Sequence, residues 1–148
     1  MKTSICICTY QRDELLERVL RCLSNIALDG PLADMDVELL VIDNAGSAAT
    51  ARLCERAGSD LKIPLRYFSE PRRGISQARN RAVAEALLGG ADMISFIDDD
   101  DLPRDDWLRA LVGKRLNTSA DIVFGSWVLG AGVPDWARGS DIFKALVT

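Results

Sequence analysis

The stretch Met93-Ile94-Ser95-Phe96-Ile97-Asp98-Asp99-Asp100-Asp101 joins an apolar run to four consecutive aspartates. An apolar run of this length that contains Ile and Phe is typical of a buried strand, so the four carboxylates are predicted to leave the sheet together at one strand end. Two carboxylates about 4 to 5 Å apart repel each other by roughly 3 to 4 kcal/mol at an effective dielectric of about 20, and a bound divalent cation removes this repulsion. In an extended segment Asp98 and Asp100 point to the same side, which predicts a site for a hard cation.

An acidic cluster after a strand can instead be a solvated turn that leads into a helix. One or two aspartates favour that simpler interpretation, whereas four in a row behind a buried strand favour Asp98 and Asp100 as metal ligands. Asp101 and Asp105 are also explained by a role in capping or charging the next helix.

The 148-residue chain has an apolar content of 48% and a formal net charge of −4. This length and composition predict a single domain over residues 1–148 with a buried core. The acidic balance disfavours a protein that binds nucleic acid or an anionic membrane surface, because both carry negative charge.

No apolar run approaches the roughly 20 residues that cross a bilayer, and the N-terminus lacks a signal-peptide pattern. We therefore predict a cytoplasmic protein without a transmembrane segment, and peripheral attachment to the inner face of a membrane stays open. The chain has no histidine, and its four cysteines lack CxxC spacing. These two facts disfavour zinc fingers, Ser-His-Asp triads and Cys-His dyads, and Cys6 and Cys8 are predicted to be reduced thiols in a strand.

Apolar strand patterns alternate with helical patterns along the chain. The predicted strands cover residues 4–8, 37–42, 65–68, 93–97 and 122–124, and the predicted helices cover residues 13–23, 48–57, 76–88 and 103–111. The first four strands are mostly apolar instead of alternating between apolar and polar residues, which indicates a mainly parallel sheet with helices on both faces, an α/β/α sandwich.

Thr9, Asp43 and Asp98 end three of these strands, and ligands of open α/β sheets bind at the carboxyl ends of the strands. Asp43 is either part of a turn with Asn44 or an acceptor for a nucleobase N–H or ribose hydroxyl. Arg79 is either part of a solvated basic face or reaches inward to a phosphate or base. The chain contains neither GxGxxG nor GxxxxGK[ST], which disfavours a dinucleotide site or a P-loop.

Four segments together resemble the N-terminal half of a family 2 glycosyltransferase with the Rossmann-like GT-A fold. These segments are SICICTYQR at residues 4–12, LLVIDNAGS at 39–47, EPRRGISQARNRAV at 70–83 and FIDDDDLPRDDWL at 96–108. Each segment alone is a weak signal, but their order and spacing agree with the family over about residues 4–125.

The resemblance implies a site for a nucleoside-diphosphate sugar linked to UDP or GDP. Its implied binding residues are Thr9, Tyr10, Arg12, Asp43, Asn44, Gly74, Arg79, Asp98 and Asp99, and Asn80 lies near them. Asp43 is the acid expected to contact the base or ribose, and Gly74 is expected to let its loop approach the donor. The metal is expected to be Mg²⁺ or Mn²⁺, held by Asp98 and Asp100 with assistance from Asp101.

The implied reaction is sugar transfer, inverting by family analogy, to a sugar or lipid-linked acceptor in cell-surface polysaccharide or glycoconjugate synthesis. A general base must take the acceptor's proton, and we expect it beyond Thr148, because the late acids Asp135 and Asp141 suit surface loops better. The short chain is therefore expected to form the donor-binding half. Apolar surface around Trp127 and Trp136 would favour a homo-oligomer.

Two other functions stay open. A non-catalytic module that binds nucleotide sugars or partners agrees with the expected lack of a base. A sugar-phosphate nucleotidyltransferase is less favoured because it requires a glycine-rich, basic first loop, which Tyr10-Gln11-Arg12 does not provide.

Overall fold

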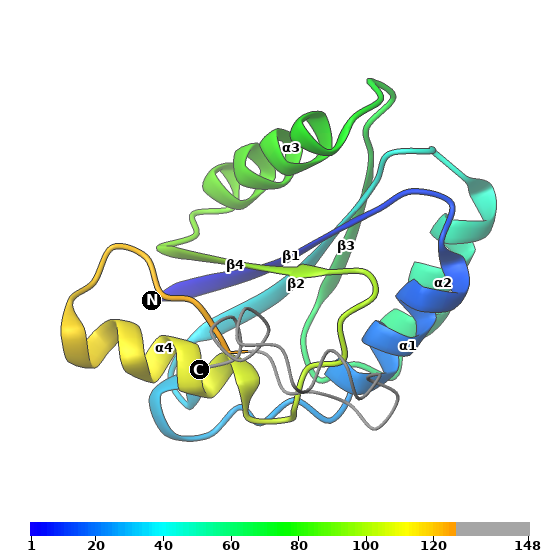
Figure 1. The fold of residues 1–148 in the computed structure, drawn as a ribbon. Coiled ribbons are helices and arrows are strands. Elements are labelled where there is room, and N and C mark those ends of the chain that lie inside the picture. The colour runs from blue at the N-terminus through cyan, green and yellow to red at the C-terminus, as the bar shows by residue number, and fades with distance from the viewer. Residues whose placement is uncertain (127–148) are drawn as a thin grey trace, which may run out of the picture.

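The computed structural model describes residues 1–126, and the predictions for Trp127, Asp135, Trp136 and Asp141 lie outside these residues. Four parallel strands form one sheet in the order β3-β2-β1-β4 (Figure 1). Their bounds are β1 Lys2–Thr9, β2 Asp36–Asp43, β3 Leu65–Ser69 and β4 Met93–Asp98. The prediction of a parallel sheet is confirmed, and each of the first four predicted strands forms with slightly wider bounds.

Helices cover both faces of this sheet, as predicted. The helices are α1 Asp13–Leu23, α2 Ala48–Gly58, α3 Ile75–Leu88 and α4 Trp107–Thr118, with the short 3-10 helix η1 at Gly30–Leu32. Figure 1 shows α3 alone above the sheet and α1, α2 and α4 below it. Within residues 1–126, no helix is both long and apolar enough to cross a membrane.

The two faces of the sheet are packed with side chains of different size. Ile5 and Ile7 of β1 point to the face that α1, α2 and α4 cover, among large aliphatic side chains. Cys6 points to the opposite face, where α3 presents alanines at positions 78, 82 and 86. Side chains alternate along a strand, so a strand buried on both faces is apolar at most positions. Small side chains repeating every four residues let α3 lie directly against the sheet.

The strand register brings the predicted strand ends together. Thr9 pairs with Asp43 across β1 and β2, and Cys8 pairs with Asp98 across β1 and β4. Because all four strands run in the same direction, the segments that follow them leave from the same edge of the sheet. The prediction that Thr9, Asp43 and Asp98 share one edge is therefore confirmed.

The predicted fifth strand is wrong. Residues 122–124 form no strand, and Ile122 and Phe124 are 71% and 86% exposed. A strand requires a neighbour for its backbone hydrogen bonds, and within residues 1–126 this short apolar segment pairs with no other strand. Three apolar residues indicate burial but do not supply such a neighbour.

Two predicted helix starts also differ from the structure. The helix after the aspartates begins at Trp107 instead of Pro103 and continues to Thr118, because its buried residues, Leu108 and Val112, lie further along the chain. The helix predicted to begin at residue 76 begins one residue earlier, at Ile75. Its N-cap is Gly74, whose φ of 126° disfavours any residue with a Cβ.

Candidate functional site

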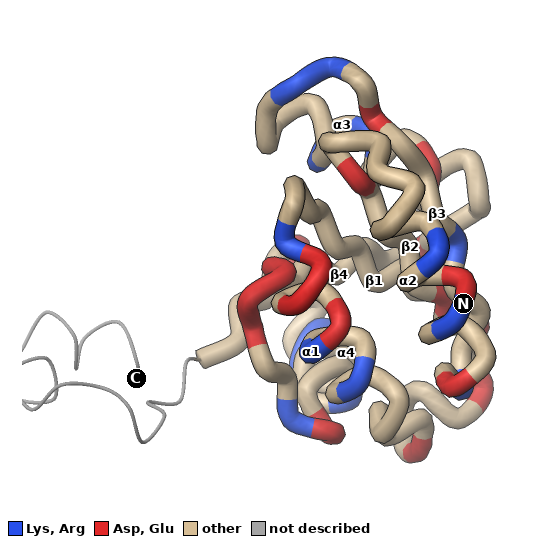
Figure 2. The backbone as a smooth tube through the Cα atoms, turned by 90° about the vertical axis from the view of Figure 1, so that its right-hand side faces the viewer, with Lys and Arg blue, Asp and Glu red and all other residues tan. Residues whose placement is uncertain are grey.

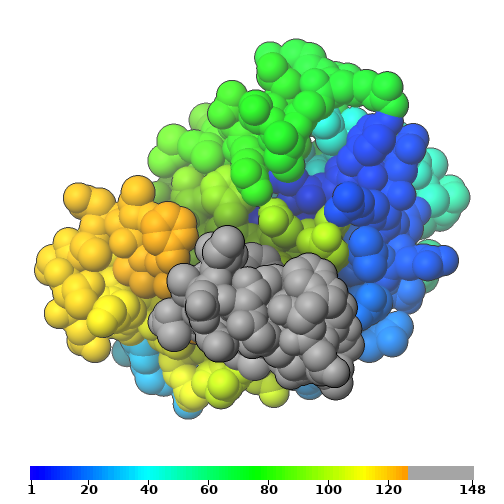
Figure 3. Space-filling model, in the orientation of Figure 1, coloured from blue at the N-terminus to red at the C-terminus, as the bar shows by residue number. Residues whose placement is uncertain are grey.

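A cleft of about 600 Å³ lies at the carboxyl ends of β1 and β4, beside the start of α3. Figure 3 shows the segments before α3, after β1 and after β4 meeting on one side of the molecule. The residues that line the cleft are Cys8, Thr9, Tyr10, Arg12, Asn44, Arg73, Gly74, Ile75, Ala78, Arg79, Asp98, Asp99 and Asp100. Most of the predicted site residues therefore come together, whereas Asp43 and Asp101 are not among the described residues that line the cleft.

Asp99 is the most firmly held of the four aspartates. Its side chain is almost fully buried, the Thr9 hydroxyl donates a hydrogen bond of 2.8 Å to one oxygen, and Arg12 donates one of 3.2 Å to the other. Both partners come from the end of β1 and the turn after it, where Gln11 adopts a φ of 54°. Asp99 thus joins the first strand to the acidic turn.

The four aspartates form a tight turn instead of an extended segment. The backbone N–H of Asp101 donates to the Asp98 carbonyl at 3.2 Å, and the Asp98 N–H donates to the Asp101 carboxylate at 3.3 Å. The alternation expected for Asp98 and Asp100 in an extended chain therefore does not apply. Their charges are balanced by arginines, with Arg79 at 3.1 Å from Asp98 and Arg12 at 3.5 Å from Asp100.

Asp101 was predicted to assist in binding a metal, but the structure places its side chain differently. Its carboxylate is directed at the backbone of its own turn and does not line the cleft. Burial raises the pKa of Asp101, the neighbouring charges of Asp98 and Asp100 raise it further, and the hydrogen bond from the Asp98 N–H lowers it. The structure thus gives Asp101 a role in the turn.

The donor atoms suit a hard cation that is shared with a ligand. Within residues 1–126, no three His, Cys, Asp or Glu side chains form a group that could hold a metal ion by themselves. Asp98 and Asp100 nevertheless both line the cleft with side chains that are 55% exposed. Mg²⁺ commonly uses one or two carboxylates and completes its coordination with phosphate oxygens and water. Two carboxylates in this cleft therefore fit an ion that arrives with a diphosphate.

Asp43 is placed differently from the predicted contact with a base or ribose. The residue is completely buried, and its carboxylate accepts hydrogen bonds from the N–H groups of Ala45 at 2.8 Å and Ser47 at 2.7 Å. The Tyr67 hydroxyl donates a third bond at 2.9 Å, and burial together with this carboxylate raises the pKa of Tyr67. The turn-forming interpretation of Asp43 describes the structure.

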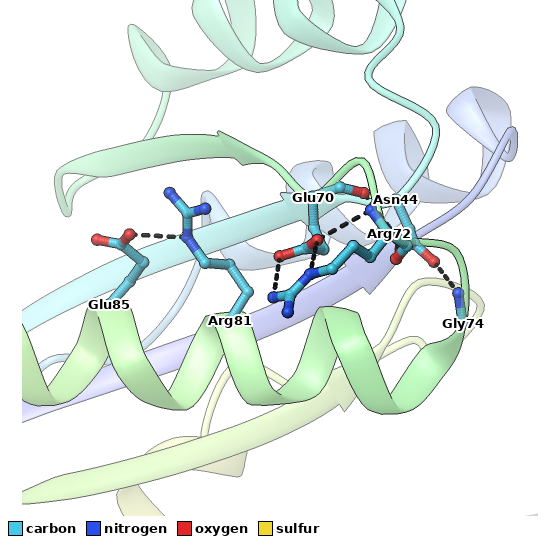
Figure 4. Close-up of polar contacts among 6 residues, drawn as sticks. All are labelled: Asn44, Glu70, Arg72, Gly74, Arg81 and Glu85. Carbon is cyan, nitrogen blue, oxygen red and sulfur yellow. Dashed lines mark hydrogen bonds and ion pairs between the residues drawn. The ribbon is translucent and has the colours of Figure 1, made fainter.

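Asn44 connects the end of β2 to the loop before α3. Its amide nitrogen donates to the carbonyl oxygens of Glu70 at 2.8 Å and Arg72 at 2.7 Å, and its amide oxygen accepts from the Gly74 N–H at 2.8 Å. Figure 4 shows Asn44 facing Gly74. Asn44 was predicted to contact the nucleotide, but the structure uses its amide mainly to hold this loop.

Arg73 also belongs to the site, although the resemblance in sequence implied no role for it. Its guanidinium lies over the Tyr10 ring at 5.1 Å from the centroid, and both residues line the cleft. Three arginines, Arg12, Arg73 and Arg79, thus surround a cleft that also contains carboxylates. Figure 2 shows the basic tip of the loop before α3 in blue at the top and the acidic segment after β4 in red below it. In the sequence, the one indication that Arg73 belongs to the site is its position directly before Gly74.

Cys8 lines the same cleft but is poorly suited to nucleophilic chemistry. Burial raises the pKa of its thiol to about 11, although the nearby Arg79 acts in the opposite direction. The thiolate is the reactive form, so at neutral pH this cysteine is almost entirely protonated. Cys6 and Cys8 are free thiols, as predicted.

Two curated relatives match most of the chain. The succinoglycan biosynthesis protein ExoM of Rhizobium meliloti is 31% identical over 142 residues, which cover 95% of this chain and 44% of ExoM. The glucosyl-dolichyl phosphate glucuronosyltransferase of Haloferax volcanii is 29% identical over 150 residues, which cover 97% of this chain and 42% of that protein. The chain therefore spans less than half the length of each relative.

Solved structures of glycosyltransferases share the fold. S. aureus TarS 1-349 in complex with UDP has a TM-score of 0.71 at 22% identity and covers 95% of this chain and 40% of its own. The mannosyltransferase PcManGT from Pyrobaculum calidifontis, in complex with GDP-Man and Mn²⁺, has a TM-score of 0.60 at 25% identity, covering 74% of this chain and 31% of its own. These similarities confirm the predicted GT-A fold.

A family model also matches the part of the chain that contains the site. The model of glycosyl transferase family 2 matches residues 4–144, a range that contains every residue lining the cleft and all four segments that carried the sequence resemblance. The chain belongs to glycosyl transferase family 2.

Proposed function

We propose that this chain forms the donor-binding half of a metal-dependent glycosyltransferase that uses a nucleoside-diphosphate sugar. The observation that carries this proposal is the pairing of arginines with aspartates across one cleft, Arg79 with Asp98 and Arg12 with Asp100. Guanidinium groups bind phosphate oxygens well, and carboxylates hold the hard cations that accompany diphosphates. The UDP and GDP-Man complexes of TarS and PcManGT agree with a ligand of this class.

The base and the diphosphate of such a donor are proposed to bind in different parts of the cleft. The base is proposed to lie near Tyr10 and Arg73, where an aromatic ring and a guanidinium plane already face each other. The diphosphate is proposed to lie nearer Arg12 and Arg79, beside the acidic turn. Binding would exchange carboxylate partners of these arginines for phosphate oxygens, leaving Asp98 and Asp100 free to hold the cation.

The chemistry needed at this end is the stabilisation of a leaving group. A nucleoside diphosphate gains negative charge as its bond to the sugar breaks, and a bound Mg²⁺ or Mn²⁺ supplies positive charge at the phosphates. Arg12 and Arg79 add fixed positive charge, while Asp99, held by Thr9, keeps the acidic turn in place. The acceptor, a sugar or lipid-linked sugar, and its general base belong to the other half of the site.

Nucleotide titration tests this proposal directly. UDP and GDP are titrated into the 148-residue chain by calorimetry, with and without Mn²⁺. We expect one nucleotide to bind about tenfold more tightly with Mn²⁺, a difference of about 1.4 kcal/mol. Asp100→Ala should abolish the effect of Mn²⁺, whereas Asp60→Ala, which changes an exposed aspartate outside the cleft, should preserve it. Failure of both nucleotides to respond to Mn²⁺ would contradict the proposal.

A further inference from the structure

The loop of residues 70–74, here called loop 70–74, forms one side of the cleft although it has no regular secondary structure of its own. It connects β3 to α3, and its last two residues, Arg73 and Gly74, line the cleft. Its position therefore decides where the Arg73 guanidinium stands relative to Tyr10. A loop that contributes to a binding site must be held by contacts from the surrounding scaffold.

Asn44 contacts loop 70–74 at its beginning, middle and end. The bonds to the carbonyl oxygens of Glu70 and Arg72 use the donors of the Asn44 amide nitrogen, and the Gly74 N–H uses one acceptor position of the amide oxygen. A carboxamide has two N–H donors and one oxygen, so no donor is left for a ligand. The backbone N–H of Asn44 donates to the Thr9 carbonyl at 2.9 Å, which ties this contact to β1.

Glu70 holds the same loop from a position outside the cleft. Its side chain is 2% exposed, and its carboxylate accepts bonds from the Arg72 N–H at 2.9 Å and from the Arg72 guanidinium at 2.9 and 3.2 Å. The Glu70 N–H donates to the Asp43 carbonyl at 2.9 Å. Figure 4 shows the Glu70 carboxylate bonded to Arg72, and Asn44 bonded to Gly74 at the other end of the loop. These bonds lower the pKa of Glu70 to about 2, which keeps the carboxylate charged at neutral pH.

We propose that Asn44 and Glu70 are positioning residues that jointly hold loop 70–74 in the shape that accepts the nucleotide. This inference rests on the proposed function, because it assigns the loop a nucleotide to accept. A positioning role differs from direct contact between Asn44 and the base. Glu70 holds the same loop but does not line the cleft, so it can act only through the loop. The two side chains act on one loop, so their effects on affinity should overlap.

A double-mutant cycle on nucleotide affinity tests this overlap. With the nucleotide that binds the wild-type chain, UDP or GDP, we expect Asn44→Ala to weaken binding about tenfold and Glu70→Gln about threefold. The double variant should also be weakened only about tenfold, because a loop already released cannot be released again. An unchanged affinity of Glu70→Gln, or a double variant weakened by the full product of about thirtyfold, would overturn the proposal.

Limited trypsin digestion tests the loop without any nucleotide. Cleavage after Arg72 and Arg73 should accelerate in Asn44→Ala and in Glu70→Gln, while other sites are cleaved at the wild-type rate. Asn117→Ala is the matched control, because it removes the same amide from an exposed position on α4. Acceleration at all sites alike, or at none, would contradict the positioning role. If the wild-type chain binds neither UDP nor GDP, the proposed function fails, and the digestion still decides whether the two residues hold the loop.

Discussion

The turn after β2 and the turn after β4 start at the same edge of the sheet, on either side of β1. Their aspartates nevertheless differ in burial and in the partners of their carboxylates. Asp43, at the first turn, is completely buried and gives its carboxylate to three donors of the protein. Asp98 and Asp100, at the second turn, keep side chains that are 55% exposed, and among residues 1–126 their carboxylates pair only with arginines that line the cleft. The first turn is complete without a ligand, whereas the second has acids that can exchange their partners.

This difference predicts that Asp43 in the first turn contributes to stability, whereas Asp98 and Asp100 in the second turn contribute to binding. A carboxylate with buried donors stabilises the fold, because its loss leaves polar groups without partners. A half-exposed carboxylate paired with an arginine contributes little to the fold, because solvent screens the pair. The expected loss of stability therefore falls from Asp43→Ala through Asp99→Ala to Asp100→Ala.

Asp43→Ala should have the largest effect. It leaves the N–H groups of Ala45 and Ser47 and the hydroxyl of Tyr67 without their acceptor, which should lower the free energy of unfolding by about 3 kcal/mol. Urea unfolding followed by circular dichroism measures this value. Asp36→Ala, at the exposed start of the same strand, should change it by less than about 0.5 kcal/mol. Equal effects of the two variants would remove the distinction between the turns.

Asp99→Ala should have an intermediate effect, because Asp99 is the one buried member of the acidic turn with two partners. Loss of the bonds from Thr9 and Arg12 should lower the free energy of unfolding by about 2 kcal/mol. Thr9→Ser, which keeps the hydroxyl, is the control and should retain most of the stability. A fully stable Asp99→Ala chain would show that the acidic turn needs no anchor on β1.

Glu70, in loop 70–74, should make the stability of the fold sensitive to acid. Hydrogen bonds from Arg72 lower its pKa from 4.5 to about 2, so the folded state binds this proton less readily than the unfolded state. The resulting stability is present above pH 4.5 and is lost as the pH falls towards 2. The free energy of unfolding, measured from pH 6 down to 2, should therefore decrease less steeply in Glu70→Gln than in the wild type. Glu55→Gln, on the exposed face of α2, should keep the wild-type slope.

Asp100→Ala should have the smallest effect on stability and the clearest effect on metal-dependent binding. Its only ion pair is the exposed one with Arg12 at 3.5 Å among the described residues, so the free energy of unfolding should change by less than about 0.5 kcal/mol. Calorimetry with UDP or GDP and Mn²⁺, beside the same urea experiment, separates the two quantities. A loss of stability as large as that of Asp43→Ala would mean that the acidic turn is structural as well.

Much of the site was predictable because it depends on the order of the strands. Parallel strands place their carboxyl ends at one edge, so Thr9, Asp43 and Asp98 were expected together before any coordinates. The direction of the Asp43 side chain was not predictable, because an Asp-Asn pair forms turns and binds ligands with the same two residue types. The metal hypothesis assumed an extended acidic segment, whereas the hydrogen bonds between Asp98 and Asp101 close it into a turn.

The amino-acid sequence by itself determined the alternation of strands and helices, the burial of β1 and β2 on both faces, and the chemical types of group at the sheet edge. These follow from local periodicity and from the strand ends, which neighbouring residues define. Only the tertiary structure decided the partner of each carboxylate, since those partners are distant in the chain. Thr9 and Asp99 are 90 positions apart, and Asn44 and Gly74 are 30 apart. Such bonds depend on where the sheet and helices bring the backbone, and no local pattern contains that information.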